Sequence, residues 1–545
     1  MQQLVDLFGF LSVVLRAGTL VFQSLLIGGV IFILWTSRNT PGDAVQRQRM
    51  ESGLWTLLRL SILGLIVIQA LYLFVDSSVL MTTAEIGFGG VVGANFFISG
   101  SVVLCAALVA LIISVSPSKV SSWAMLAPAI VVLAASLMTN HAASRLEGRP
   151  LLIAVTAIHE AATGFWVGGL PYLVLALYRD KNSTARFYIT ERFSRLALMS
   201  VFLIALSGLT MSIVYIGSWQ GVLGTAYGVM VVAKAVMLGV LMLLGGINFL
   251  MLRDMPRDQI MPRLRRLIEA EVGIGITVIL TAASLTSQPP AVDQPNEIVS
   301  FHQIVQRFRP TLPRLTYTQV ADAGRTAPGQ SGNSSDAPTS IPVAYNVDGQ
   351  PLSAELVNNS IESESNHHWM GVIVLGMGLL ALLARTGKAP WAEYWPLLLI
   401  GIAIFIILQA DSECWPVGWK SIGACMADPE VFQHRLAAIV CIGFAVFELR
   451  VRKRRRDNDP LALVFPLMCA AGGAVLLTHS HAIVNVKENL LVELSHVPMG
   501  ILAVFAGWAR WLELRLPAEN RRIPSWVWPA CFVLIGAGLL NYREM

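Results

Sequence analysis

Charged residues are scarce in this chain: they make up 13% of its 545 residues, while 55% are hydrophobic. A soluble domain carries about 25% charged residues, so the composition excludes an ordinary soluble protein and indicates an integral membrane protein. The sequence also lacks a Walker loop, a dinucleotide-binding fingerprint and a CxxC motif. These absences argue against ATP-driven pumping by this chain alone and against a soluble enzyme.

Cysteine is sparse as well, with six in the chain. Four of them lie in apolar runs, where we expect small core residues rather than a disulfide framework: Cys105, Cys441, Cys469 and Cys531. The other two, Cys414 and Cys425, share one polar loop. They can form a disulfide if that loop faces an oxidising compartment.

Apolar runs of about 20 residues, the length of a helix that crosses a bilayer, recur from end to end. They predict an all-α polytopic membrane bundle of about fourteen helices, eight before a polar stretch and six after it. The expected spans are 10–36, 54–80, 92–115, 121–141, 150–178, 194–217, 227–252, 266–287, 369–386, 391–410, 431–450, 460–480, 490–514 and 524–541. The predicted domains are an eight-helix membrane domain at 1–290, a polar linker at 291–366 and a six-helix membrane domain at 367–545.

Basic residues gather in alternate short loops, as in the run at 452–456, and such loops mark the cytoplasmic side. They set orientation in the lipid bilayer and do not indicate a nucleic-acid partner. This topology places both termini and the linker on the outer side of the membrane, which is the periplasm if the membrane is a bacterial inner membrane. On it, all nine histidines lie outside or in the outer half of a span: His141, His159, His302, His367, His368, His434, His479, His481 and His496.

Histidine is the commonest metal ligand, and two groups of these histidines are candidate metal sites. The denser group comes from three consecutive predicted helices and includes a carboxylate: His434, His479, His481, Glu493 and His496. Glu493 and His496 are three residues apart, so they share one helix face. The thinner group is His141 with His159.

Ionisable residues well inside a span are candidate functional residues. His159, Glu160 and Lys234 meet this criterion, and Glu160 and Lys234 reach similar depths, so they can pair. Glu271, with Glu269, lies near the inner end of its helix. The two can form an exit carboxylate site or neutralise Arg265 and Arg266, and we favour the second interpretation. His302 is interpreted as incidental, and His367 and His368 stand at the start of the ninth predicted helix without an assigned role.

Methionines accompany several histidines, among them Met138, Met370, Met426 and Met499. A thioether together with an imidazole suits copper, Cu(I) in particular. Methionine also fills apolar helices without any further role.

Residues 55–290 resemble the copper-resistance D (CopD) family of bacterial inner-membrane proteins. The matching stretches are His159-Glu160, 165–170, 192–195, 206–209, 224–228 with Lys234, Asn248, and Glu271 followed by Pro289-Pro290. The last six helices resemble the extension of longer members. The resemblance implies copper transport or resistance at the inner membrane and a periplasmic copper-carrying partner, with copper as cargo and no enzymatic activity. The external position of the histidines favours import toward the cytoplasm.

The fold of that family resembles the transmembrane di-haem cytochrome b superfamily, which gives an alternative function. An electron carrier with haem b needs two axial imidazoles on facing helices. His434 with His496, His481 with His496, or His141 with His159 are the candidate pairs. A structural or assembly role is the third interpretation.

Overall fold

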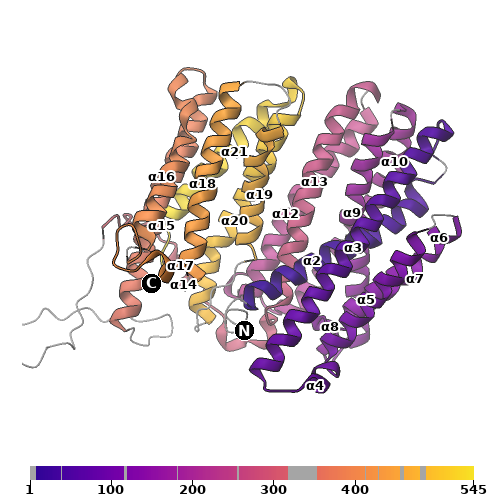
Figure 1. Ribbon diagram of the computed structural model, residues 1–545, viewed down its shortest axis with the longest axis horizontal. Coiled ribbons are helices and arrows are strands. Elements are labelled where there is room, and N and C mark those ends of the chain that lie inside the picture. Colours follow the sequence, from indigo (N-terminus) through magenta and orange to yellow (C-terminus); the bar gives the residue numbers. More distant parts are fainter. Residues whose placement is uncertain are drawn as a thin grey trace, which may run out of the picture. The chain divides into compact units, whose positions relative to one another are not determined.

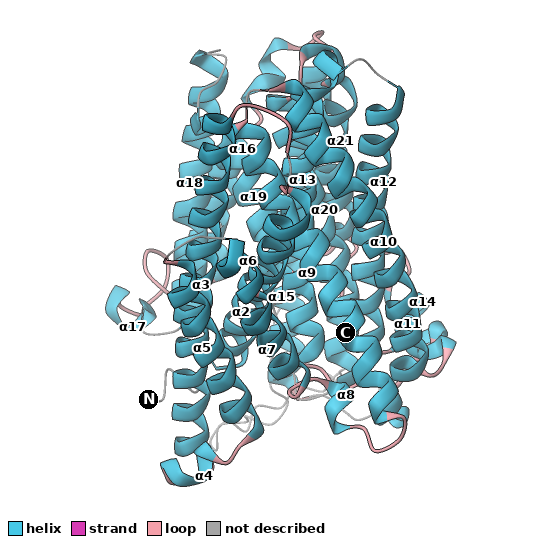
Figure 2. Cartoon of the chain, turned by 90° about the vertical axis from the view of Figure 1, so that its right-hand side faces the viewer, coloured by secondary structure: helices cyan, strands magenta, loops and turns pink. Residues whose placement is uncertain are grey.

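The protein is helical throughout the part of the chain that the structure describes. The computed structural model describes residues 8–38, 40–115, 119–180, 182–254, 257–316, 353–411, 413–426, 429–454, 460–478 and 486–544. Figure 2 shows helices joined by loops, and the one β-bridge in these residues pairs Cys414 with Lys420. The all-α prediction is confirmed.

The chain folds into two compact units. Unit 1 consists of Met1–Asn296 with two short later segments, Ala474–Ser480 and Arg515–Arg521. Unit 2 consists of Glu297–Gly473, His481–Leu514 and Arg522–Met545.

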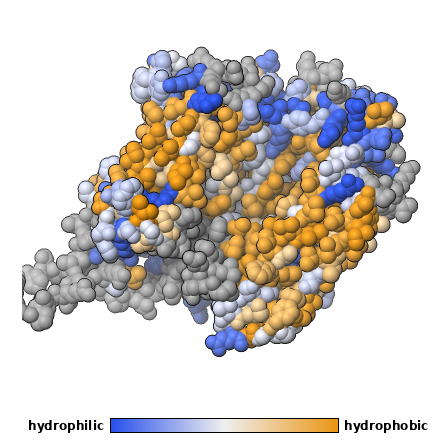
Figure 3. Space-filling view, viewed as in Figure 1, coloured by the Kyte–Doolittle hydropathy of each residue, from blue (hydrophilic) through white to orange (hydrophobic). Residues whose placement is uncertain are grey.

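Unit 1 is a bundle of long apolar helices with short helices at their ends (Figure 1). Its elements are α2 (Phe8–Ile31), η1 (Phe32–Thr36), α3 (Ala44–Thr83), α4 (Phe88–Val92), α5 (Asn95–Ser114), α6 (Lys119–Ala124), α7 (Leu126–Leu137), α8 (His141–Ser144), α9 (Arg149–Arg179), α10 (Ser183–Ile216), α11 (Trp219–Gly224), α12 (Ala226–Asp254), α13 (Arg257–Thr286) and η2 (Ala291–Asp293). Many large apolar side chains point outward, such as Phe74 and Ile112. Figure 3 shows this apolar surface in orange, as a lipid-facing bundle requires.

Helices α2 and α9 approach so closely that their backbones touch. A Cβ atom on Gly168 would lie 1.9 Å from the carbonyl oxygen of Ser24, and one on Gly28 would lie 2.3 Å from the carbonyl carbon of Gly168. Only glycine fits at these positions, as is usual where membrane helices pack through small residues. This glycine seam fixes α9, which carries His159 and Glu160, against α2.

Unit 2 contains α14 (Phe301–Arg307), α15 (Ala354–Arg385), η4 (Pro390–Tyr394), α16 (Leu397–Phe405), η5 (Ile406–Ala410), α17 (Ile422–Met426), α18 (Pro429–Arg454), η6 (Pro460–Leu463), most of α19 (Val464–Leu476), nearly all of α20 (Val486–Arg515) and α21 (Arg522–Leu540). Its apolar core surrounds two buried tryptophans, Trp395 and Trp528, whose rings lie 5.4 Å apart. Helices α15 and α21 pack along their length.

In the described residues, ten helices are long and apolar enough to cross a membrane, so the prediction of a polytopic bundle is confirmed. Three shorter apolar helices, at Ser122–Leu137, Leu397–Ala410 and Pro460–Leu476, coincide with three more of the predicted spans. The 26-residue α18 coincides with another. The total of fourteen spans and the periplasmic side of the termini stay predictions.

The ninth predicted helix begins much earlier than its apolar run. Helix α15 starts at Ala354, capped by the Ser353 hydroxyl, whereas the apolar run predicted a span from residue 369. The added turns are polar, so a search for apolar runs misses them. His367 and His368 therefore lie inside a helix, and the interpretation that they begin it is wrong.

Candidate functional site

His159 lies inside α9 and contacts α10. Its Nδ1 is 3.0 Å from Ser207 Oγ, and the Ser207 hydroxyl donates to the Leu203 carbonyl at 2.6 Å. Because the hydroxyl has one proton and gives it to Leu203, its oxygen accepts from His159 Nδ1–H. The lone pair of the ring is then on Nε2, the arrangement typical of a metal-binding imidazole held by its other nitrogen.

Glu160, the next residue, is held by the end of α7. Ser136 Oγ donates to Glu160 Oε2 at 2.8 Å, and the Asn140 side-chain amide donates to Oε1. Arg16 on α2 donates to the Asn140 amide oxygen at 3.2 Å, and its charge acts on Glu160. Helices α2 and α7 and the turn before α8 therefore position this carboxylate.

Lys234 on α12 is close enough for its charge to act on both His159 and Glu160. Their similar depths in the sequence allowed Lys234 to pair with Glu160, but no ion pair joins them among the described residues. The Glu160 oxygens are satisfied by Ser136 and Asn140 instead. A cation, an imidazole and a carboxylate thus share one region inside the predicted spans.

Glu271 on α13 is buried and accepts a hydrogen bond from the Asn248 amide on α12. The interpretation that Glu271 neutralises an arginine is wrong, because its carboxyl group binds Asn248. Its neighbour Glu269 is the residue that forms an ion pair with an arginine, at 2.6 Å from Arg266. Asn248 faces α13 inside the bundle and so reaches Glu271. The arginines near the helix end do not reach it.

His141 does not end the fourth long helix, as the sequence suggested, but begins the separate short helix α8. Its ring packs edge-on against Tyr215 and Tyr227, with centroids 6.1 and 6.2 Å away. His141 Nε2 and the Tyr215 hydroxyl are both buried without a hydrogen-bond partner in the described part of the chain. Burial lowers the pKa of His141, and nearby Arg145 acts in the same direction.

In unit 2, His434 on α18 lies 2.9 Å from Asp411 Oδ1 through its Nδ1. His496 on α20 donates from Nδ1 to the Val492 carbonyl at 2.9 Å, and Glu493 is buried one turn earlier. His479 and His481 lie outside the described residues. Within the described ranges, no three His, Cys, Asp or Glu side chains come together in a metal-binding group. The predicted cluster of four histidines and Glu493 therefore stays a prediction.

Cys414 and Cys425 form a disulfide that closes the polar loop between η5 and α18. The loop carries exposed aromatic side chains, with Trp419 82% accessible. The four other cysteines are free thiols.

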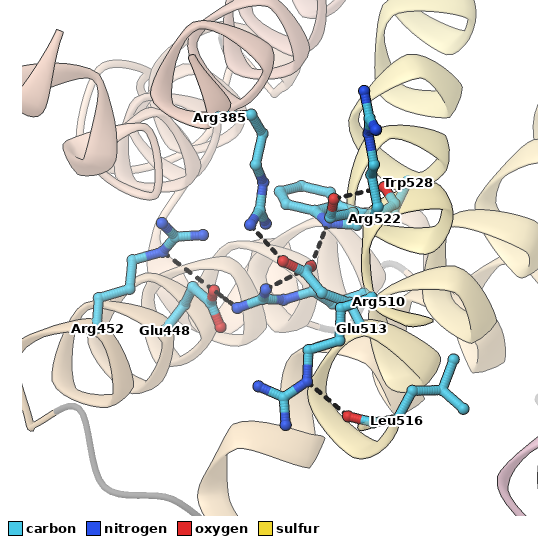
Figure 4. A network of polar contacts seen from close by, with 10 residues as sticks. Arg385, Glu448, Arg452, Arg510, Glu513, Leu516, Arg522 and Trp528 are labelled. Atoms are coloured by element: carbon cyan, nitrogen blue, oxygen red, sulfur yellow. Dashed lines mark hydrogen bonds and ion pairs between the residues drawn. The ribbon is translucent and has the colours of Figure 1, made fainter. Parts of the chain in front are cut away.

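A buried network of charges crosses unit 2 and was missed in the sequence. Arg510 on α20 donates to Glu448 on α18 at 2.8 Å and to Glu513 at 2.7 Å, and lies between the two carboxylates in Figure 4. Glu513 also binds Arg385 and the Trp528 indole, and Glu448 binds Arg452. The signal that should have found the network is the presence of charged residues inside predicted spans.

The family model of Copper resistance protein D matches residues 188–285, from α10 to near the end of α13. This part of the chain is similar to the copper resistance protein D family. The matched region contains Ser207, Lys234, Asn248 and Glu271. It is narrower than the 55–290 region expected from the sequence, and His159 and Glu160 precede it.

A curated relative, the Copper transport protein CutJ of Bacillus subtilis (strain 168), is 35% identical to this chain over 161 residues. The alignment covers 29% of this chain and 29% of the relative, so the chain matches less than a third of the relative's length. No solved structure matches the chain.

Proposed function

We propose that this protein carries copper ions across the bacterial inner membrane toward the cytoplasm. The observation that carries the proposal is the group formed by His159, Glu160 and Lys234 inside helices of membrane-crossing length. Ionisable side chains are costly in a bilayer and mark ion pathways when they face the inside of a bundle.

The geometry of His159 supports a ligand role. Ser207 holds Nδ1–H and so leaves Nε2 as the coordinating atom. Neutral imidazole suits copper among other transition metals. The Glu160 carboxylate beside it supplies the negative charge that favours a bound cation, and Asn248 with Glu271 forms a second polar station on the next pair of helices.

The names of the related proteins support copper as the cargo. The matched family is described by copper resistance, and the Bacillus relative by copper transport. Carriage of an ion by such residues needs no enzymatic step. The proposal includes capture of copper at the periplasmic face by His141 and the unit 2 histidines. A periplasmic copper carrier is the proposed donor.

The test is copper uptake by the full-length protein in sealed right-side-out membrane vesicles under reducing conditions. His159→Ala is expected to abolish uptake, and Ser207→Ala to slow it by about 10-fold, because loss of such an outer support weakens metal binding by 10–100-fold. The matched control is His302→Ala, since His302 is exposed on α14. Uptake that is equal in the wild type and His159→Ala contradicts the proposal.

An optical spectrum of the purified protein separates copper carriage from the haem alternative. A Soret band with sharp bands in the reduced state indicates haem ligation and replaces the copper proposal. A spectrum without them, together with copper uptake, supports it.

A further inference from the structure

Two helices of unit 2 carry the same spacing of carboxylate, imidazole and thioether. On α15 the order is Glu364, His367 and Met370, three residues apart at each step. On α20 it is Glu493, His496 and Met499. Residues three apart lie on neighbouring turns of one helix face, so each helix presents the three chemistries in the same order along its axis.

The two helices run in the same direction, because both are antiparallel to α21. On α15, a Cβ on Gly371 would meet Leu540 and one on Gly378 would meet Val533. On α20, Met499 lies beside Gly538 and Glu513 accepts a hydrogen bond from Trp528. Later residues of α15 and α20 therefore pair with earlier residues of α21, and the two sequences lie in register.

The two imidazoles meet at one level. The ring centroids of His367 and His496 are 5.9 Å apart, with their planes at 89°. A metal–nitrogen bond of about 2 Å places the centroids of two imidazoles that share one ion about 6 Å apart. The observed separation of the two centroids matches this value.

Both rings are held by the same device. His367 Nδ1 donates to the Ser363 carbonyl at 2.8 Å, and His496 Nδ1 donates to the Val492 carbonyl at 2.9 Å. Each ring therefore carries its lone pair on Nε2, the form in which imidazole binds a metal while its other nitrogen is fixed by a carbonyl.

His368, the neighbour of His367, is used differently. Its Nε2 lies 3.0 Å from the Tyr542 carbonyl, and its Nδ1 accepts from the Arg314 N–H at 2.8 Å. Both of its nitrogens join backbone segments, so His368 is a structural residue and provides a contrast to His367.

Tyr542, after the end of α21, closes over the two rings. It stacks on His367 at 3.9 Å and meets His496 edge-on at 5.6 Å. The segment 542–544, which contains Tyr542, is anchored by Glu364. This carboxylate accepts the Glu544 N–H at 3.0 Å and pairs with Arg314. Tyr542 thus limits how far either imidazole can turn.

From this geometry we propose that His367 and His496 bind one Cu(I) ion between them, with the thioethers of Met370 and Met499 one turn further along α15 and α20. Thioether and imidazole together select Cu(I) among the metals that imidazole accepts. The inference rests on the proposed function, because it assumes that copper is the cargo. It adds a site in unit 2, with His367 as a ligand.

The test is equilibrium binding of Cu(I) to the purified full-length protein in detergent, under anaerobic reducing conditions, against a chromophoric Cu(I) chelator. His367→Ala and His496→Ala are each expected to lose the same single ion, and the double variant is expected to lose no more than either one. Met499→Leu is expected to weaken that ion by about 10-fold. The matched control, His302→Ala, is expected to bind as the wild type does.

Folding is checked in each variant by gel filtration and thermal unfolding. If His367→Ala does not fold, His367→Gln and His367→Cys replace it. The Gln variant is expected to lose the ion, while the Cys variant, with a soft ligand at the same place, is expected to keep it. Retention of the ion by a folded His367→Gln or His496→Ala variant overturns the inference.

The outcome is distinguishable from failure of the proposed function. If the wild type takes up no copper but each histidine variant binds one ion fewer, the proposed site stands and only the transport proposal fails. If uptake depends on His159 but both unit 2 variants keep the ion, the proposed site is wrong and the transport proposal stands.

Discussion

Asn248 on α12 donates a hydrogen bond to the buried carboxyl group of Glu271 on α13. The two residues are 23 positions apart and join neighbouring helices of unit 1 within the region matched by the family model. A buried carboxyl group that loses its donor keeps the full cost of desolvation.

Asn248→Ala is therefore expected to lower the free energy of unfolding by about 1–3 kcal/mol. Asn248→Leu combined with Glu271→Leu is expected to recover most of the lost stability, because neither position then carries a buried polar group that needs a partner. Denaturation in mixed micelles measures both. An Asn248→Ala variant as stable as the wild type contradicts the assigned contact.

The charge network of unit 2 predicts a larger effect. Arg510→Ala leaves Glu448 and Glu513 buried without their shared cation, and removal of one partner from a buried ion pair costs about 3–5 kcal/mol. The control is Arg522→Ala, an exposed arginine of α21, which is expected to change the free energy of unfolding by less than about 0.5 kcal/mol. Equal losses in the two variants rule out a structural role for the network.

His141 predicts a pH dependence of stability. Its pKa in the folded protein lies below its ordinary value of 6.5 because the ring is buried. Between the two values the unfolded chain binds the extra proton, so the stabilising contribution is complete above about pH 6.5 and is lost as the pH falls below it. His141→Gln is expected to flatten the acid side of a plot of Tm against pH, while His302→Gln leaves its shape unchanged. The assignment is wrong if both variants give the same slope.

The disulfide predicts the number of reactive thiols. Protein isolated without reductant, unfolded and alkylated, is expected to gain four labels, on Cys105, Cys441, Cys469 and Cys531. After reduction it is expected to gain six, because Cys414 and Cys425 are released. Mass spectrometry counts the labels, and Cys414→Ser is expected to expose Cys425 without reductant. Six labels before reduction contradict both the disulfide and an oxidising surrounding for this loop.

Most of the helices could be predicted from the sequence, because hydropathy over about 20 residues is a local property. The polar turns of α15 could not be found in this way. Their helical state depends on contacts of His368 and Glu364 with residues 314 and 542–544, which are distant in sequence.

The polar residues were easier to find than their partners. His159, Glu160, Lys234 and Glu271 stand out as ionisable residues inside apolar runs. Which side chains bind them is decided by how the helices pack, so Ser207 as the support of His159 was not foreseen. For Glu271, the nearby arginines suggested the wrong partner, since sequence proximity does not say which helix face a side chain occupies.

The glycine seam between α2 and α9 has a mechanical consequence for unit 1. Two backbones in direct contact have no side-chain layer that can rearrange, so α2 and α9 are expected to move as one rigid body. Arg16 on the first helix and His159 with Glu160 on the second are then held at a constant spacing. If copper passes His159, as proposed, the displacement has to come from the helices that carry its other neighbours, α10 with Ser207 and α12 with Lys234.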